Sequence, residues 1–112
     1  MDPLTRGTLV LVALPGGYGK PRPALVVQTD LFNPVHASIS LVPVTTSLVD
    51  APLFRLTVDP SPGNGLRAVS QIMIDKLTAV RRDRVRRAIG QLETETLVRV
   101  NRALALWLGL AS

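Results

Sequence analysis

The chain has 112 residues, no cysteine and one histidine, and its 13 basic against 8 acidic residues give a net charge of +5. This length suits one domain with one core. Without cysteine there can be no disulfide, thiolate metal site or thiol nucleophile, and no apolar run is long enough to cross a bilayer. We therefore expect one cytoplasmic domain over residues 1–112, without membrane association.

The basic excess is concentrated between residues 76 and 87, where six Lys and Arg side chains stand close to Asp75 and Asp83. Guanidinium groups bind phosphate through parallel hydrogen bonds, so this balance favours a nucleic acid or an acidic peptide as partner. Composition alone does not choose between these two partners. The structural alternative is a solvated, arginine-rich face.

Short strands separated by turns rich in glycine and proline account for most of the chain. The apolar, β-branched run at residues 8–14 predicts a strand buried on both faces, and the segment PGGYGKP at 15–21 predicts a loop. A basic turn is expected before the last strand. Six strands are predicted, at residues 8–14, 24–29, 38–44, 54–58, 68–77 and 87–92.

One segment, near the C-terminus, has the apolar spacing of a helix. Thr94 suits the N-cap, with Glu95 in the first turn, and Gly109 suits the position just past the end. We expect the apolar face to pack in the core or in a dimer interface. A mainly β fold follows, with a strongly bent sheet or small barrel and one packed helix. The apolar face contains Leu97, Val100, Leu104, Trp107 and Leu108.

Several short motifs follow one another along the chain in a recognisable order. They are Arg6-Gly7, KPRPA at 20–24, VPVTT at 42–46, Ser70-Gln71 with IDKL at 74–77, RAIGQL at 87–92 and RALALWLGL at 102–110. Together they resemble the MazF/PemK toxins over essentially the whole chain. The resemblance implies an SH3-like barrel of the CcdB/PemK type with a C-terminal helix, and a homodimer.

The same resemblance implies the toxin of a type II toxin–antitoxin system. Such a toxin is an endoribonuclease that cuts single-stranded RNA at short motifs and arrests translation and growth. Attack by the 2′-hydroxyl leaves a 2′,3′-cyclic phosphate and a 5′-hydroxyl. The implied protein partner is an acidic, partly disordered antitoxin of the MazE kind. Because the 2′-hydroxyl is the nucleophile, neither a metal nor another cofactor is required, and we expect none.

The resemblance places the catalytic pair at Arg22 and Thr45. Arg22 stands between two prolines, and its planar cation can clamp a phosphate and stabilise transition-state charge. A guanidinium group stays protonated at neutral pH and is therefore a poor base. Thr45 can bind a phosphate oxygen or orient the 2′-hydroxyl. A histidine pair is excluded because His36 is the single histidine, and we expect it to be an exposed loop residue.

Six further residues are expected to contact RNA, namely Tyr18, Lys20, Thr46, Ser47, Ser70 and Gln71. Tyr18 can stack on a base and Lys20 can pair with phosphate. Gln71 either reads a base edge or holds the site together as a buried amide. Some family members have Asp and Arg, with acid/base roles, where this chain has Ser70 and Ala68. The identity of the general base is therefore left open.

Two other function classes stay open at this point. Gyrase-poisoning toxins of the CcdB kind share the fold and end in Trp-Gly plus an aliphatic residue, which WLGL at 107–110 resembles only faintly. A non-catalytic nucleic-acid-binding barrel would use the same basic residues without cleavage.

Overall fold

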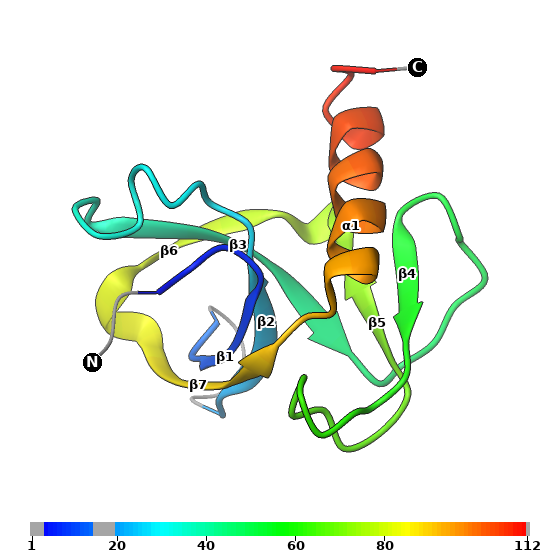
Figure 1. The fold of residues 1–112 in the computed structure, drawn as a ribbon, viewed down its shortest axis with the longest axis horizontal. Helices are drawn as coiled ribbons and strands as arrows, with labels where there is room; N and C mark the ends of the chain where they lie inside the picture. The colour runs from blue at the N-terminus through cyan, green and yellow to red at the C-terminus, as the bar shows by residue number, and fades with distance from the viewer. Residues whose placement is uncertain (1–3, 15–19, 112) are drawn as a thin grey trace.

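The computed structural model describes residues 4–14 and 20–111, and in these ranges a bent antiparallel sheet carries one C-terminal helix (Figure 1). The strand path is β4-β5-β3-β2-β1-β7, and β6 pairs with β3 off this path. No helix in these ranges is long and apolar enough to cross a membrane. The elements are β1 (Thr8–Val12), β2 (Arg22–Val26), β3 (Ser38–Thr45), β4 (Arg55–Val58), β5 (Ser70–Met73), η1 (Ile74–Lys76), β6 (Thr78–Arg81), η2 (Arg82–Arg84), β7 (Val85–Gln91) and α1 (Thr94–Trp107).

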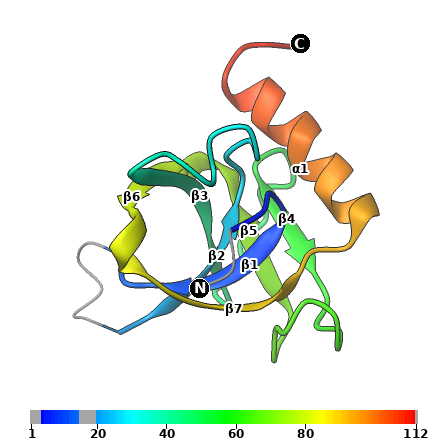
Figure 2. The same ribbon diagram turned by 60° about the vertical axis from the view of Figure 1, so that its left-hand side comes forward.

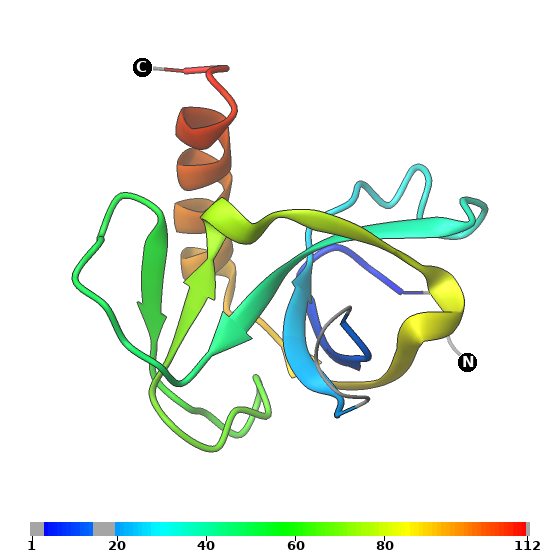
Figure 3. The same cartoon turned by 180° about the vertical axis from the view of Figure 1, so that it is seen from behind.

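Strand β3 is shared by the two halves of the sheet. Its first residues pair with β6, its middle with β2, and Val44 and Thr45 at its end pair with β5. Figure 3 shows β3 running from the side of β2 and β6 towards the β4–β5 hairpin. Because β3 changes partners along its length, its end meets the start of β2 and the start of β5.

Apolar side chains form two clusters, and alternate residues of β1 supply both. Leu9 and its partner Leu25 belong to the cluster beneath α1, whereas Val10 and its partner Ala24 belong to the cluster enclosed by β1, β2, β3 and β6. This arrangement explains the continuous apolar run of the first strand. The prediction that the strand is buried on both faces is confirmed, although the strand ends at Val12 rather than at residue 14.

The turn at residues 59–65 packs on the end of β7. The Gln91 N–H donates to the Gly63 carbonyl at 2.9 Å, and Asn64 is fully buried beneath the turn. A Cβ atom added to Gly90 would lie 2.3 Å from the carbonyl carbon of Asn64. Glycine at position 90 therefore allows the two backbones to approach this closely.

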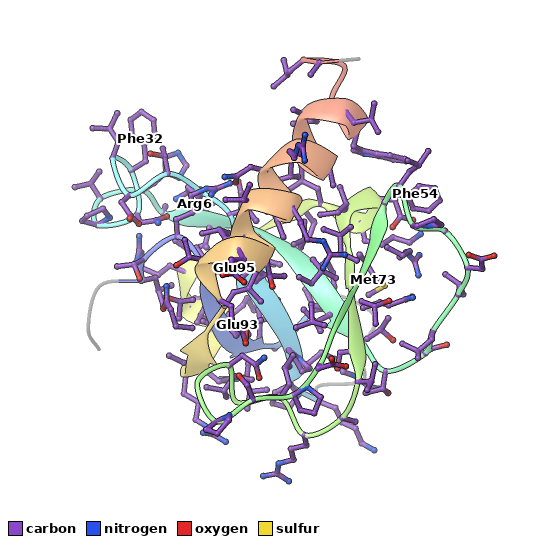
Figure 4. The ribbon with its side chains drawn as sticks, turned by 45° about the vertical axis from the view of Figure 1, so that its right-hand side comes forward. Arg6, Phe32, Phe54, Met73, Glu93 and Glu95 are labelled. Carbon is purple, nitrogen blue, oxygen red and sulfur yellow. The ribbon has the colours of Figure 1, made fainter. Side chains whose placement is uncertain are left out.

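Helix α1 begins one residue earlier than predicted. Its N-cap is Glu93 rather than Thr94, and no side chain caps its first N–H groups. The Glu93 carboxylate instead accepts hydrogen bonds from Ser61 Oγ at 2.9 Å and from Asn64 Nδ2 at 2.8 Å, which tie the start of the helix to the turn below it (Figure 4). The predicted end is confirmed. Gly109 adopts a φ of 74°, and its N–H donates to the Leu106 carbonyl.

The predicted apolar face of the helix is buried only in part. Val100 is buried, and Leu97 and Leu104 are half-buried. Trp107 is 49% exposed and packs against Phe54 with ring centroids 5.6 Å apart. Leu108 is also exposed. Figure 2 shows the C-terminal end of α1 extending beyond the sheet. The last apolar residues of the helix face are therefore little covered by the rest of the chain.

The predicted strand at 68–77 is too long, and strand β6 was missed. Strand β5 ends at Met73, and the chain then makes the 3-10 turn η1 before β6. Ile74 stays in the core after the strand has ended, so apolar alternation continues past the end. The expected basic turn contains β6, η2 and the start of β7. Its exposed arginines conceal the buried Val80 and Val85.

Candidate active site

A cleft of about 390 Å³ opens where β2 begins, β3 ends and β5 begins. It brings together segments that are far apart in the chain, and it holds both members of the predicted catalytic pair. Arg22 is the one charged residue in its lining, among the residues that the structure describes. The lining consists of Leu14, Arg22, Pro23, Pro43, Val44, Thr45, Thr46, Ser70 and Met73.

Arg22 is the first residue of β2 and lies on one wall of this cleft. It pairs with Val12 on β1, and its side chain is exposed. The following Pro23 favours extended backbone at Arg22 and thereby limits the directions in which the guanidinium can point. In the described ranges the ion pairs are Arg55–Asp75 and Arg81–Asp83, and Arg22 is in neither. A bound anion would therefore meet a cation that no carboxylate of the described residues neutralises.

Thr45 is the last residue of β3 and is half-buried on the cleft wall. Its Oγ1 accepts a hydrogen bond from the Ser47 N–H at 3.0 Å. A hydroxyl that accepts in this way still has its own proton to donate. Thr45 can therefore donate a hydrogen bond to a phosphate oxygen in the cleft.

Ser70 and Gln71 are adjacent on β5, but they face different surroundings. Ser70 is buried in the lining, and its Oγ donates to the Ala68 carbonyl at 2.9 Å, so towards a ligand it can only accept. Gln71 is also buried but is not part of the lining. Its amide bonds to Val49 and Thr57.

The other predicted contacts lie around the cleft or outside it. Thr46 is exposed and in the lining. Lys20 and Ser47 are exposed and lie outside it. Tyr18 falls outside the described residues. His36 is exposed in its loop, as predicted, and its Nδ1 accepts the Ser38 N–H at 3.1 Å.

The predicted basic segment is a solvated face rather than a wall of the cleft. Most of its side chains are exposed, and Arg81 pairs with Asp83. Arg82 is half-buried and donates to the carbonyls of Asn33 and His36, so it fixes the loop before β3. Among the described residues, His, Asp and Glu form no group of three that could hold a metal ion.

Sequence reasoning missed an ion pair beside the cleft. Arg55 donates to both carboxylate oxygens of Asp75, at 2.8 and 3.1 Å, and both side chains are about 15% exposed. These hydrogen bonds hold the pKa of Asp75 below its ordinary value, despite the opposing effect of burial. Arg55 also pairs with Met73, a residue of the lining. No sequence motif links Arg55 to Asp75, because the two residues come together only where the chain turns at η1 and places the Asp75 carboxylate beside β4.

A second, smaller hollow of about 270 Å³ lies between the 59–61 turn and the start of α1. Its lining mixes the acidic Asp59 and Glu93 with Arg99. It contains none of the predicted site residues.

Known proteins resemble this chain in sequence over nearly its whole length. Residues 5–108 match the family described as PemK-like, MazF-like toxin of type II toxin-antitoxin system. A probable endoribonuclease MazF of Mycolicibacterium smegmatis is 45% identical over 109 residues, which cover 96% of this chain and 99% of the relative.

Solved structures agree in fold. An endoribonuclease in complex with its cognate antitoxin, from a mycobacterial species, superposes with a TM-score of 0.80 at 25% identity, covering 97% of this chain and 98% of that one. The Mycobacterium tuberculosis toxin MazF-mt6 gives a TM-score of 0.80 at 21% identity, covering 94% and 99%. The expected CcdB/PemK-type fold, mainly β with one C-terminal helix, is thereby confirmed. The chain belongs to the PemK-like, MazF-like family of toxins of type II toxin–antitoxin systems.

Proposed function

We propose that this endoribonuclease toxin cuts single-stranded RNA at short motifs in the cleft between Arg22 and Thr45, and that its action arrests translation and growth. The RNA's own 2′-hydroxyl is the nucleophile. The observation that carries the proposal is the lining itself, as residues 4–14 and 20–111 form it: it combines Arg22, which is in neither of the ion pairs of these ranges, with the hydroxyls of Thr45 and Thr46, and it contains no carboxylate. Such a lining favours a polyanion. In this proposal residues 1–112 form a single toxin domain.

The bond changes assign a role to each side chain. The 2′-oxygen attacks phosphorus and the bond from phosphorus to the 5′-oxygen breaks, so the products are a 2′,3′-cyclic phosphate and a 5′-hydroxyl. Arg22 stabilises the charge that develops on the phosphorane, and Thr45 donates a hydrogen bond to a phosphate oxygen. In this proposal the 2′-hydroxyl proton passes to solvent, which also supplies the proton for the 5′-oxygen; the described residues of the lining contain no carboxylate or imidazole.

Neighbouring residues bind the nucleotides on either side. Lys20 pairs with a flanking phosphate, Tyr18 stacks on a base, and Thr46 and Ser47 contact the RNA beside Thr45. Ser70 accepts a hydrogen bond at the floor of the cleft. The exposed basic face increases the rate of encounter with RNA without reading its sequence.

A defined RNA oligonucleotide tests the proposal. We expect cleavage in excess EDTA, and we expect an analogue with 2′-deoxyribose at the scissile position to bind without being cut. Loss of cleavage in EDTA with recovery in Mg²⁺ would contradict the proposal, as would cleavage of the analogue. Binding without cleavage of any RNA would indicate a non-catalytic barrel. Gyrase inhibition without RNA cleavage would indicate a CcdB-like poison.

In this proposal the active toxin is a homodimer of two copies of the chain. Exposed apolar side chains on α1 support it, since Val98 is 52%, Leu106 42% and Trp107 49% exposed. Apolar surface of this kind is commonly covered by a symmetric partner. Light scattering at micromolar concentration should give the mass of two chains, and the mass of one chain would count against the dimer.

The inhibitor in this proposal is an acidic, partly disordered antitoxin that acts in the cytoplasm, where the RNA is. The net charge of +5 supports an acidic partner, and the mycobacterial relative was solved in complex with its cognate antitoxin. Titration of an acidic antitoxin peptide should show affinity that falls as salt is raised, because exposed charges are screened. Affinity that does not change with salt would contradict the electrostatic part.

A further inference from the structure

Gln71 lies at the centre of a row of side chains that crosses three strands. It pairs with Thr45 on β3 and with Thr57 on β4. Arg22, at the start of β2, lines the same cleft as Thr45. Directly opposed residues of neighbouring strands share a face of the sheet. Gln71 is thus the immediate neighbour of Thr45, although it is only 5% exposed and does not line the cleft.

The amide of Gln71 is occupied by protein atoms. Its Oε1 accepts the Val49 N–H at 3.0 Å, and its Nε2 donates to the Val49 carbonyl at 2.9 Å and to Thr57 Oγ1 at 3.2 Å. The two bonds to one residue repeat the exchange that a paired strand would make. An RNA base could bind this amide only by displacing buried hydrogen bonds.

Val49 belongs to the loop at residues 46–54, which contains no strand or helix. The loop is tied at two points close to the cleft, where the Ser47 N–H donates to Thr45 Oγ1 and the Val49 backbone binds Gln71. Leu48 and Val49 are about half exposed, so apolar burial does little to hold this stretch. The Gln71 amide is therefore the main restraint on the chain just after Thr45.

We propose that Gln71 is a positioning residue, which holds residues 46–49 against β5 and so keeps the Thr45 hydroxyl aimed into the cleft. The inference rests on the proposed function. With Ser47 in place, the Thr45 oxygen is committed as an acceptor from the loop and its proton is directed elsewhere, towards a bound phosphate. We call the hydrogen bonds between the Gln71 amide and the Val49 backbone the clamp. When the clamp is removed, the hydrogen bond from the Ser47 N–H to Thr45 can break, and the Thr45 hydroxyl then rotates freely.

The variant Gln71→Met keeps the length of the side chain and removes the donor and the acceptor. With an RNA oligonucleotide as substrate, we expect kcat to fall about tenfold, an effect of about 1.4 kcal/mol on the barrier. The preferred cleavage motif should not change, and affinity for the 2′-deoxy analogue should fall by a smaller factor than kcat, through the loosened contacts of Thr46 and Ser47. A weaker affinity for the analogue together with a relaxed cleavage motif would show that Gln71 reads a base, and would overturn the proposal.

The chain offers a matched control in Gln28, whose amide makes a similar clamp away from the cleft. Its Nε2 donates to the Ser38 carbonyl at 3.1 Å, and its Oε1 accepts the Ser40 N–H at 3.0 Å. Gln28→Met should lower Tm and leave kcat unchanged. If both variants lower kcat in proportion to their loss of Tm, the role of Gln71 is only structural and the proposal fails.

A double-mutant cycle tests whether Gln71 acts through Thr45. In a Thr45→Val background the hydroxyl is absent, so Gln71→Met should then cost less than twofold in kcat. If the kcat of the double variant falls by the product of the two single-variant factors, the proposal is overturned. If Gln71→Met does not fold, Gln71→Asn serves in the same cycle, because its shortened amide cannot reach Val49 with the same geometry.

Hydrogen exchange tests the clamp without any cleavage assay. A failure of the proposal about Gln71 can therefore be distinguished from a failure of the proposed function. In the full chain, the N–H groups of Val49 and Ser47 should be protected, and each should exchange at least tenfold faster in the Gln71 variant. The Ser40 N–H should not change. Exchange at Ser47 that is unaffected by the variant would overturn the proposal, whether or not the wild-type protein cuts RNA.

Discussion

Arg22 and Thr45, which are 23 positions apart in the sequence, line the same cleft from the start of β2 and the end of β3, two neighbouring antiparallel strands. The start of β2 supplies the cation and the end of β3 supplies the hydroxyl. Each residue lies just beyond the paired segment of β2 and β3, which ends at Ala24 and Pro43, and their shared place in the cleft is the basis of the first two predictions.

Replacement of Arg22 by Ala should lower the cleavage rate by about 10² or more, the effect of removing one preorganised donor that stabilises transition-state charge. Arg22→Lys keeps the charge but loses the planar fork, so it should restore RNA binding better than it restores the rate. Single-turnover cleavage and analogue binding measure both effects. Arg102→Ala, an exposed change on α1, is the control. An Arg22→Ala rate equal to wild type would place the active site elsewhere.

Thr45→Val keeps the branched shape of the side chain and removes its hydroxyl. We expect cleavage to slow by about tenfold or more, because a donor to the phosphate is lost, with Tm nearly unchanged. Thr45→Ser should retain most of the rate. Thr78→Val removes a similar exposed hydroxyl on β6 and serves as the matched control. Wild-type cleavage by Thr45→Val would remove this residue from the mechanism.

Alanine at Gly65 should destabilise the fold much more than alanine at Gly109. Both glycines have positive φ, of 72° and 74°, so both substitutions carry a similar backbone strain of about 1–2 kcal/mol. At Gly65 the new Cβ would also lie 2.1 Å from the Ile89 carbonyl oxygen, whereas at Gly109 nothing lies within 4 Å.

Thermal unfolding measures the difference between the two glycine variants. Overpacking costs about 1–3 kcal/mol, so the Tm of Gly65→Ala should lie several degrees below that of Gly109→Ala. Equal Tm values would show that the turn at 59–65 can move away from β7 without loss of stability.

The Arg55–Asp75 pair should make stability depend on acidity. Hydrogen bonds from Arg55 lower the pKa of Asp75 in the folded state below its ordinary value of 3.8. The stabilisation is therefore fully present above that value and is lost as pH falls through the lower, folded-state pKa. The free-energy difference between wild type and Asp75→Asn should be constant from about pH 5 upwards and should shrink below about pH 4.

Urea unfolding at a series of pH values measures this difference. Asp83→Asn is the control, because Asp83 forms an exposed pair with Arg81 whose side chains are 63% and 73% exposed. Exposed pairs contribute little to stability, so this variant should differ from wild type by under about 1 kcal/mol at any pH. A difference between wild type and Asp75→Asn that does not vary with pH would show that the Arg55–Asp75 pair is not linked to folding.

The sequence alone determined the fold class, most strand positions and the C-terminal helix with its ending glycine, whereas the catalytic pair, proposed from the family resemblance, stays a prediction. Apolar periodicity and turn residues are local signals, and they suffice for elements such as β1 and α1. They failed at β6, where Val80 is the one buried residue among the exposed Thr78, Ala79 and Arg81, and at the end of β5, where Ile74 stays buried after the strand has stopped.

Only the tertiary structure decided which polar side chains share a cleft and which support it. Ser70 and Gln71 are neighbours in the sequence, yet Ser70 lines the cleft and the amide of Gln71 is hydrogen-bonded to the Val49 backbone. The Arg55–Asp75 pair depends on the return of η1 to β4. Strand register and chain reversals create these contacts between residues far apart in the sequence, and no local pattern encodes a register that the packing of the whole sheet selects.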